Sequence, residues 1–170
     1  MWYVIWTFSG KEERLRSAVE KNVPSDVYNR CVIPKRKIKK RIRGKWESVE
    51  QRLFPSYVFV ETEDIGRFND ELKKIHGFSV ILHNEDDYYC PLSRDEEHFL
   101  LSLIGLGETV EESIGIKEGS EIIVISGPLV GMEGQIRKID RHKRIAILEM
   151  ELFSRKTEVK VSLELLDKKI

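Results

Sequence analysis

The 170-residue sequence predicts an α+β domain followed by a small all-β barrel of SH3-like type. Residues 1–104 alternate between aromatic and β-branched runs, which favour strands, and segments with the 3.6-residue period of amphipathic helices. Residues 118–170 contain only short alternating runs such as EIIVI and TEVKV, separated by turns. Residues 105–117 combine glycines and glutamates without a clear period, which indicates a flexible linker between two domains.

Helix starts and turns divide the first domain into elements. Ser9 with Glu12, and Ser93 with Glu96, have the spacing of capping boxes, and Asp64 precedes a third amphipathic segment. In chain order we expect an antiparallel sheet with flanking helices, with strands at 2–8, 28–34, 46–60, 78–82 and 87–91 and helices at 9–23, 64–77 and 93–104. Between the second and third strands, the segment 34–46 is expected to form a hairpin with its tip at 43–45.

The formal net charge of zero hides a strong asymmetry along the chain. Residues 30–60 carry a charge of +8 and residues 61–118 a charge of −10. The segment PKRKIKKRIRGKW, residues 34–46, holds eight Lys or Arg in thirteen positions. Because charges act over a Debye length of about 8 Å in physiological salt, this segment can attract a polyanion on its own.

Several classes of function are disfavoured by what the sequence lacks. No apolar run approaches the roughly 20 residues that cross a bilayer, and the N-terminus does not resemble a secretion signal, so we expect a cytoplasmic protein without a membrane partner. Cys31 and Cys90 are expected to be reduced thiols. Neither has a metal-ligand or catalytic spacing, and no phosphate-binding glycine motif occurs. We therefore expect no metal, no cofactor and no enzymatic activity.

The second domain resembles the KOW motif of small barrels in ribosomal proteins and elongation factors. The resemblance rests on an apolar strand, then Gly127-Pro128, Gly131 and Gly134, then a second strand within residues 118–150. In the first domain, the opening WYVI, the capped helix, the basic hairpin and LFPSYVFV at 53–60 resemble the NusG N-terminal (NGN) domain. The chain is thus similar to NusG family transcription elongation factors, with NGN at 1–104, a linker at 105–117 and KOW at 118–170. The long basic hairpin, and Ser56 where the family usually has Gly, resemble a specialised paralogue of the LoaP type.

The resemblance implies that the first domain binds the clamp helices of RNA polymerase through a hydrophobic depression. The residues that match this depression are Trp6, Phe54, Pro55, Tyr57 and Phe59. Tyr and Trp are favoured at protein interfaces, although burial in the core is an equal alternative for Tyr57 and Phe59. A second polymerase contact of some paralogues, a polar HTTT-like stretch, would fall at residues 68–71, which read FNDE here.

The resemblance also implies a partner loop in the KOW domain, where family members grasp a ribosomal protein or a termination factor. It corresponds to Leu129, Val130 and Met132, which we expect to be exposed.

Nucleic acid is the polyanion that we expect at the basic hairpin, either a nascent RNA hairpin or upstream DNA. Arg forks can hold phosphates, and Trp46 offers a stacking surface for an unpaired base. The expected binding residues are Lys35, Arg36, Lys37, Lys39, Lys40, Arg41, Arg43, Lys45 and Trp46, with a weaker second patch at Lys138, Arg141, Lys143 and Arg144. The function expected is that of a monomeric transcription elongation or antitermination factor. The alternative is a structural RNA-binding protein of the ribosomal KOW type.

Overall fold

The computed structural model describes residues 1–167 and divides into two compact units. The first unit combines Met1–Pro34 with Phe54–Glu97, and the second combines Lys35–Leu53 with the chain from His98 onward. The first unit contains β1 (Trp2–Thr7), α1 (Glu12–Asn22), β2 (Arg30–Val32), β5 (Tyr57–Glu61), α2 (Ile65–Leu72) and β6 (Ser79–Ile81). Helix α3 (Arg94–Ile104) begins in the first unit and ends in the second.

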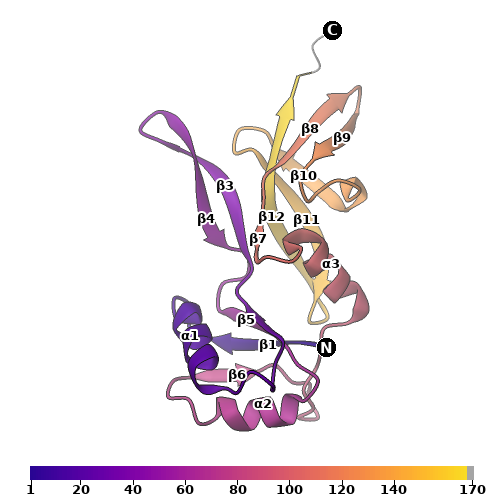
Figure 1. Ribbon diagram of the computed structural model, residues 1–170. Helices are drawn as coiled ribbons and strands as arrows, with labels where there is room; N and C mark the ends of the chain where they lie inside the picture. The colour runs from indigo at the N-terminus through magenta and orange to yellow at the C-terminus, as the bar shows by residue number, and fades with distance from the viewer. Residues whose placement is uncertain (168–170) are drawn as a thin grey trace. The chain divides into compact units, whose positions relative to one another are not determined.

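The first unit contains an antiparallel sheet with the strand order β2-β5-β1-β6, of which Figure 1 labels β5, β1 and β6. One face carries Tyr3 and Ile5 of β1 and Val58 and Val60 of β5, and these side chains share a core with residues of α1 and α2. Because side chains alternate along a strand, Trp6, Tyr57 and Phe59 lie on the opposite face, where Trp6 is the register partner of Tyr57. The expected antiparallel sheet with flanking helices is confirmed.

Two of the three predicted helix starts form as expected. Ser93 and Glu96 make the reciprocal capping box, with each backbone N–H donating to the other side chain, at 2.7 and 3.2 Å. Asp64 accepts from the N–H of Arg67 at 2.9 Å.

The predicted capping box at Ser9 is wrong, because Lys11 is the N-cap of α1. The carboxylate of Glu12 accepts instead from the N–H groups of Gly10 and Ser56.

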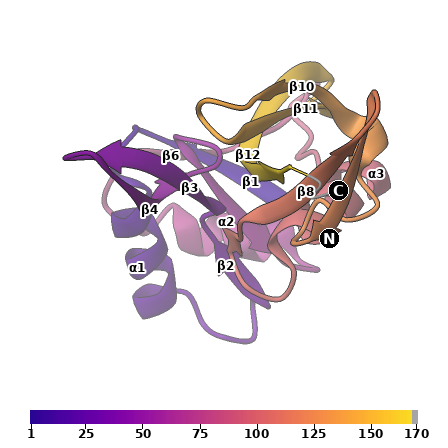
Figure 2. The same ribbon diagram turned by 90° about the horizontal axis from the view of Figure 1, so that it is seen from above.

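The second unit contains a five-stranded sheet with the order β10-β11-β12-β8-β9. Cross-strand pairs such as Ala146 with Val161 and Leu148 with Val159 are buried, and the strands curl around this interior (Figure 2). The strands are β8 (Ser113–Glu118), β9 (Glu121–Ser126), β10 (Ile136–Asp140), β11 (Ile145–Leu152) and β12 (Arg155–Leu166), with a short 3-10 helix, η1 (Glu133–Gln135). This small β domain matches the expected KOW-type fold.

The basic segment forms the predicted hairpin, which belongs to the second unit. Strand β3 (Lys35–Ile42) pairs with β4 (Lys45–Arg52), and β7 (Thr109–Val110) pairs with the base of β3 in parallel (Figure 1). Arg43 and Gly44 at the tip have φ values of 49° and 81°. Two consecutive positive φ angles are typical of the tight turn that matches the twist of a hairpin.

The structure differs from the expected elements at three places. The strand predicted at 46–60 is two strands, because a turn at 53–56, with Ser56 at φ 74°, separates β4 from β5. The strand predicted at 87–91 is only an isolated bridge between His83 and Tyr89. The segment predicted as a flexible linker, 105–117, holds β7 and most of β8, whose long-range strand partners outweigh its glycine-rich composition.

Candidate functional site

The basic hairpin has an inner half near its base and an outer half near its tip, and the two halves differ in how their charges are compensated. In the inner half, Lys35, Lys37 and Lys39 project from one face of β3 and each forms an ion pair. In the outer half, no described carboxylate pairs with the four cations Lys40, Arg41, Arg43 and Lys45, and all four are exposed. Arg41 Nε donates a hydrogen bond to the Gly44 carbonyl at 3.4 Å, within the hairpin turn. The outer half is therefore a concentrated positive charge open to solvent.

Arg36 and Ile38 attach the hairpin rather than present charge to solvent. Arg36 donates to the carbonyl of Lys160 in β12 and, at 3.3 Å, to Gln51 Oε1, while Ile38 is buried. Partial burial lowers the pKa of the Arg36 guanidinium, although it remains charged near neutral pH. Of the predicted nucleic-acid residues, Arg36 is thus placed as an anchor of the hairpin.

Trp46 of β4 lies against the predicted second basic patch of the barrel. The guanidinium of Arg144 stacks 4.3 Å from the centre of the Trp46 ring, a cation–π contact, and Arg144 also pairs with Glu164 at 3.2 Å. Arg141 pairs with Asp167 at 3.3 Å, whereas Lys138 and Lys143 are exposed without an ion pair among the described residues. Trp46 and Arg144 therefore join the hairpin and this patch into one composite surface.

The predicted polymerase-binding residues of the first unit differ in exposure. Phe54 and Phe59 are buried, with Phe59 at 0% exposure, and their ring centroids lie 5.6 Å apart. Trp6 and Tyr57 are half-buried and Pro55 is exposed. The side chains that reach the surface are thus Trp6, Pro55 and Tyr57, with the two Phe rings behind them as support.

Two exposed aromatic residues lie beside Trp6 and were not predicted as site residues. Phe8 and Phe78 have exposed fractions of 56% and 52%, and the three ring centroids lie 5.2 to 5.4 Å apart. Phe8 ends an aromatic run that predicts a strand, but β1 ends at Thr7. Phe78 falls in the strand predicted at 78–82, but β6 begins at Ser79. Exposed aromatic clusters of this kind are typical of interaction surfaces.

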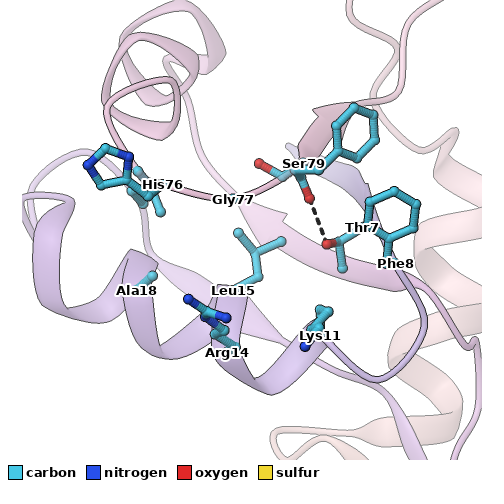
Figure 3. A pocket seen from close by; sticks show the side chains of 11 residues that line it. Thr7, Phe8, Lys11, Arg14, Leu15, Ala18, His76, Gly77 and Ser79 are labelled. Carbon is cyan, nitrogen blue, oxygen red and sulfur yellow. Dashed lines mark hydrogen bonds between the residues drawn. The ribbon is translucent and has the colours of Figure 1, made fainter.

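A groove of about 260 Å³ runs beside this cluster (Figure 3). Leu15 and Ala18 of α1 line it together with Phe8 and Phe78. Basic groups come from Lys11 and Arg14 at the start of α1 and from His76 in the loop before β6. Thr7 Oγ1 donates to the Phe78 carbonyl at 2.7 Å, which fixes the loop next to β1. The groove thus combines apolar walls with cationic side chains.

The predicted partner loop of the barrel is mostly buried. Leu129 has 0% exposure and Met132 is also buried, so the expectation that both are exposed is wrong. The Ser113 hydroxyl accepts from the Leu129 N–H at 3.1 Å, which directs this part of the loop inward. Val130 remains exposed. Neither the family resemblance nor the apolar composition of this loop determines which of its side chains pack into the interior of the barrel.

Residues 68–71, where the sequence departs from the paralogues' second polymerase contact, lie within α2. Phe68 of this stretch is fully buried in the core shared by α1, α2 and the sheet.

Other kinds of site find no support within residues 1–167. No group of three or more His, Cys, Asp or Glu side chains there could hold a metal ion. No helix in the same range is long and apolar enough to cross a membrane. Cys31 and Cys90 are not joined in a disulfide.

The antiparallel α+β unit and the small KOW-type β domain have the architecture that the sequence resemblance implies. The family model "Transcription termination factor nusG" matches residues 1–101, and the KOW motif matches residues 118–151. The chain belongs to the NusG family, whose members act in transcription and are not enzymes.

Curated relatives and a solved structure match nearly the whole chain. NusG of Bacillus subtilis, named a transcription termination/antitermination protein, is 29% identical and covers 98% of this chain and 97% of its own length. The Thermus thermophilus protein of the same name is 27% identical, over 94% of each chain. A solved structure described as domain interaction in Thermotoga maritima NusG has a TM-score of 0.54 and 26% identity, and covers 95% of this chain and 92% of its own.

Proposed function

We propose that this protein is a transcription elongation and antitermination factor that docks on the clamp helices of RNA polymerase and contacts nucleic acid through its basic hairpin. The observation that carries the nucleic-acid part is the outer half of the hairpin, where four exposed cations have no described carboxylate partner. Unpaired like charges repel one another in the free protein, and this repulsion is relieved when a polyanion binds.

The polymerase contact is assigned to the surface formed by Trp6, Pro55 and Tyr57. Two of these residues are partly exposed aromatic side chains in register on adjacent strands, and Phe59 packs on the same face of the sheet. Partly exposed Trp and Tyr on a rigid sheet provide contact area at a low entropic cost. The relatives of this chain bear the name of a transcription termination/antitermination protein, which agrees with an action on the transcribing polymerase.

An RNA hairpin in the nascent transcript is the ligand that suits the composite surface best. The outer half of the hairpin offers four cations, and the barrel adds Lys138 and Lys143 beyond the Trp46–Arg144 contact. A folded RNA presents phosphates on two strands, which can meet two basic elements at once. Trp46 is already stacked by Arg144, so an unpaired base must displace or extend that stack.

The groove of the first unit supports a contact with single-stranded nucleic acid. Phe8 and Phe78 offer ring faces on which a base can stack, and Lys11, Arg14 and His76 can meet the backbone phosphates. The combination of stacking faces with basic groups disfavours a purely apolar protein ligand.

A second candidate function, a structural RNA-binding protein of ribosomal KOW type, shares the barrel and the basic hairpin. It gives no role to the aromatic surface of the first unit. At the KOW loop, a ribosomal protein or a termination factor could contact the exposed side chain of Val130 and its neighbours.

The test of the nucleic-acid contact replaces Lys40, Arg41, Arg43 and Lys45 together by Ala. RNA affinity is measured against salt concentration, with the full chain and a hairpin RNA from a leader transcript. We expect the affinity to fall and the salt slope to decrease by about 0.7 to 0.9 for each lost phosphate contact. The matched control replaces Lys21, Lys73, Lys74 and Arg94, four exposed cations of the first unit, by Ala. Equal losses in the two variants would contradict a specific role for the hairpin.

A further inference from the structure

Three glutamates lie along the inner half of the basic hairpin, and they belong to the segment that the sequence marks as a linker. Strand β7 runs parallel to β3 and pairs Lys35 with Thr109 and Arg36 with Val110 (Figure 1). The Lys35 N–H donates to the Glu108 carbonyl at 2.8 Å. This backbone pairing places residues 108–112 alongside the lysines of β3.

The glutamates match the lysines one by one. Lys35 Nζ lies 3.2 Å from Glu108 Oε1, and Lys37 Nζ lies 2.9 Å from both carboxylate oxygens of Glu111. Lys39 pairs with Glu112 at 3.7 Å, and the other oxygen of Glu112 accepts from Ser48 Oγ at 3.1 Å. Every second residue of β3, from position 35 to position 39, is thus matched by one carboxylate of the same short segment.

The pairing stabilises the charged form of the central lysine. The hydrogen bond to Glu111, with further support from the charges of Glu111, Glu50 and Glu112, raises the pKa of Lys37. A phosphate that approaches Lys37 therefore meets an ammonium whose counterion is part of the protein. It must displace the Glu111 carboxylate, whereas at the outer half it displaces only salt ions.

We propose that Glu108, Glu111 and Glu112 act as an internal competitor for nucleic acid on the inner half of the hairpin. This inference rests on the proposed function, because it assumes that the hairpin binds nucleic acid. Ligands first engage the outer cations, and only those that reach along β3 can exchange their phosphates for the three carboxylates. The effect is to weaken binding to arbitrary nucleic acid and to reserve the full hairpin for a ligand of the right shape.

The test uses the full chain with Glu108, Glu111 and Glu112 replaced together by Gln. The probe is a single-stranded poly-uridine RNA, and its dissociation constant is measured over a range of KCl concentrations. Because exposed ion pairs each contribute little, we expect about 3- to 30-fold tighter binding at low salt. Lys37 and Lys39 become available to phosphates, whereas Lys35 keeps Glu50 at 3.7 Å, so the salt slope should steepen by up to about 1.4, at roughly 0.7 per contact for single strands.

The matched control carries the same change of net charge in the other compact unit. It replaces Glu85 by Gln and Asp86 and Asp87 by Asn, in an exposed loop of the first unit. If both variants tighten binding equally, the effect is one of overall charge and the inference is overturned. If the wild type binds and the triple Gln variant binds equally or more weakly, the inference is overturned as well. The three glutamates then only stabilise the hairpin.

Failure of the proposed function gives a different result. If neither the wild type nor the triple Gln variant binds poly-uridine or a leader hairpin RNA, the nucleic-acid function falls, and the competitor inference falls with it. The thermal unfolding midpoint distinguishes a purely structural role of the three glutamates from competition with nucleic acid. A purely structural role predicts lower stability of the triple Gln variant without tighter RNA binding.

Discussion

The carboxylate of Glu12 accepts a hydrogen bond from the N–H of Ser56 at 2.8 Å, across 44 positions of sequence. Its other oxygen accepts from the Gly10 N–H, also at 2.8 Å, and the Glu12 side chain is fully buried. The Ser56 carbonyl in turn accepts a hydrogen bond from the Thr7 N–H at 2.9 Å. Glu12 thereby ties the start of α1 to the turn that carries Pro55 and Tyr57 of the proposed polymerase surface.

Replacing Glu12 by Ala should destabilise the protein by about 2 to 4 kcal/mol, because two buried backbone donors lose their acceptor and a small cavity forms. Urea unfolding measures the change. Glu20→Ala, an exposed position on the same helix, is the control and should change stability by less than about 0.5 kcal/mol. Similar values for the two variants would show that the Glu12 bonds do not stabilise the turn.

Ser56→Gly should raise the free energy of unfolding by roughly 0.5 to 1 kcal/mol. Ser56 has a φ of 74°, a left-handed conformation that costs a residue with a Cβ about 1 to 2 kcal/mol and that glycine adopts freely. The greater entropy of glycine in the unfolded chain offsets part of this gain. Ser17→Gly, at an exposed position of α1, should have the opposite sign, so a loss of stability at both sites would contradict the strain at Ser56.

Tyr57→Ala and Phe59→Ala should separate binding from folding on the same strand. Tyr57 is partly exposed, so its truncation should leave the domain folded and weaken binding to purified bacterial RNA polymerase by more than about 2 kcal/mol, as at interface hot spots. Phe59 has no exposed surface, so its truncation should cost about 3 to 5 kcal/mol of stability. Circular dichroism melting and polymerase pull-down measure the two effects. A folded Tyr57→Ala variant with undiminished affinity would remove this residue from the proposed interface.

Replacing Phe8 and Phe78 together by Ser should reduce photocrosslinking of the protein to a bromouracil-substituted single strand of DNA. The loss of a stacked base is worth about 1 to 3 kcal/mol, which corresponds to a decrease of roughly fivefold or more. Tyr88→Ser is the control, since Tyr88 is an exposed aromatic residue outside the groove. If the control loses as much crosslinking as the double variant, the groove has no special affinity for bases.

A barrel fragment that begins at residue 111 should fold, whereas one that begins at residue 119 should not. Strand β8 (Ser113–Glu118) lies between β12 and β9, and the shorter fragment lacks all of it. Its loss leaves two strands without their partner and exposes the buried side of Leu163. Amide dispersion in a two-dimensional NMR spectrum distinguishes the two fragments. A folded shorter fragment would mean that β8 is dispensable.

The sequence alone determined most elements and the position of the strongest charge. Local rules suffice for the Ser93–Glu96 capping box, the Asp64 helix start and the hairpin tip at Arg43-Gly44, because each depends on residues within a few positions of one another. The alternating runs of the barrel became strands for the same reason. The resemblance to NusG was carried by motifs that remain contiguous in the chain, and it is confirmed.

The tertiary structure decided which of these residues are accessible. Lys35, Lys37 and Lys39 are indistinguishable in sequence from Lys40, Arg41, Arg43 and Lys45, yet the former meet glutamates more than 70 positions away, as in the pair of Lys35 with Glu108. Phe59 is likewise buried whereas Tyr57 is partly exposed, and Leu129 is buried whereas Val130 is exposed. Such outcomes follow from which strands pair and which face packs inward. Those are properties of the folded chain that no local period encodes.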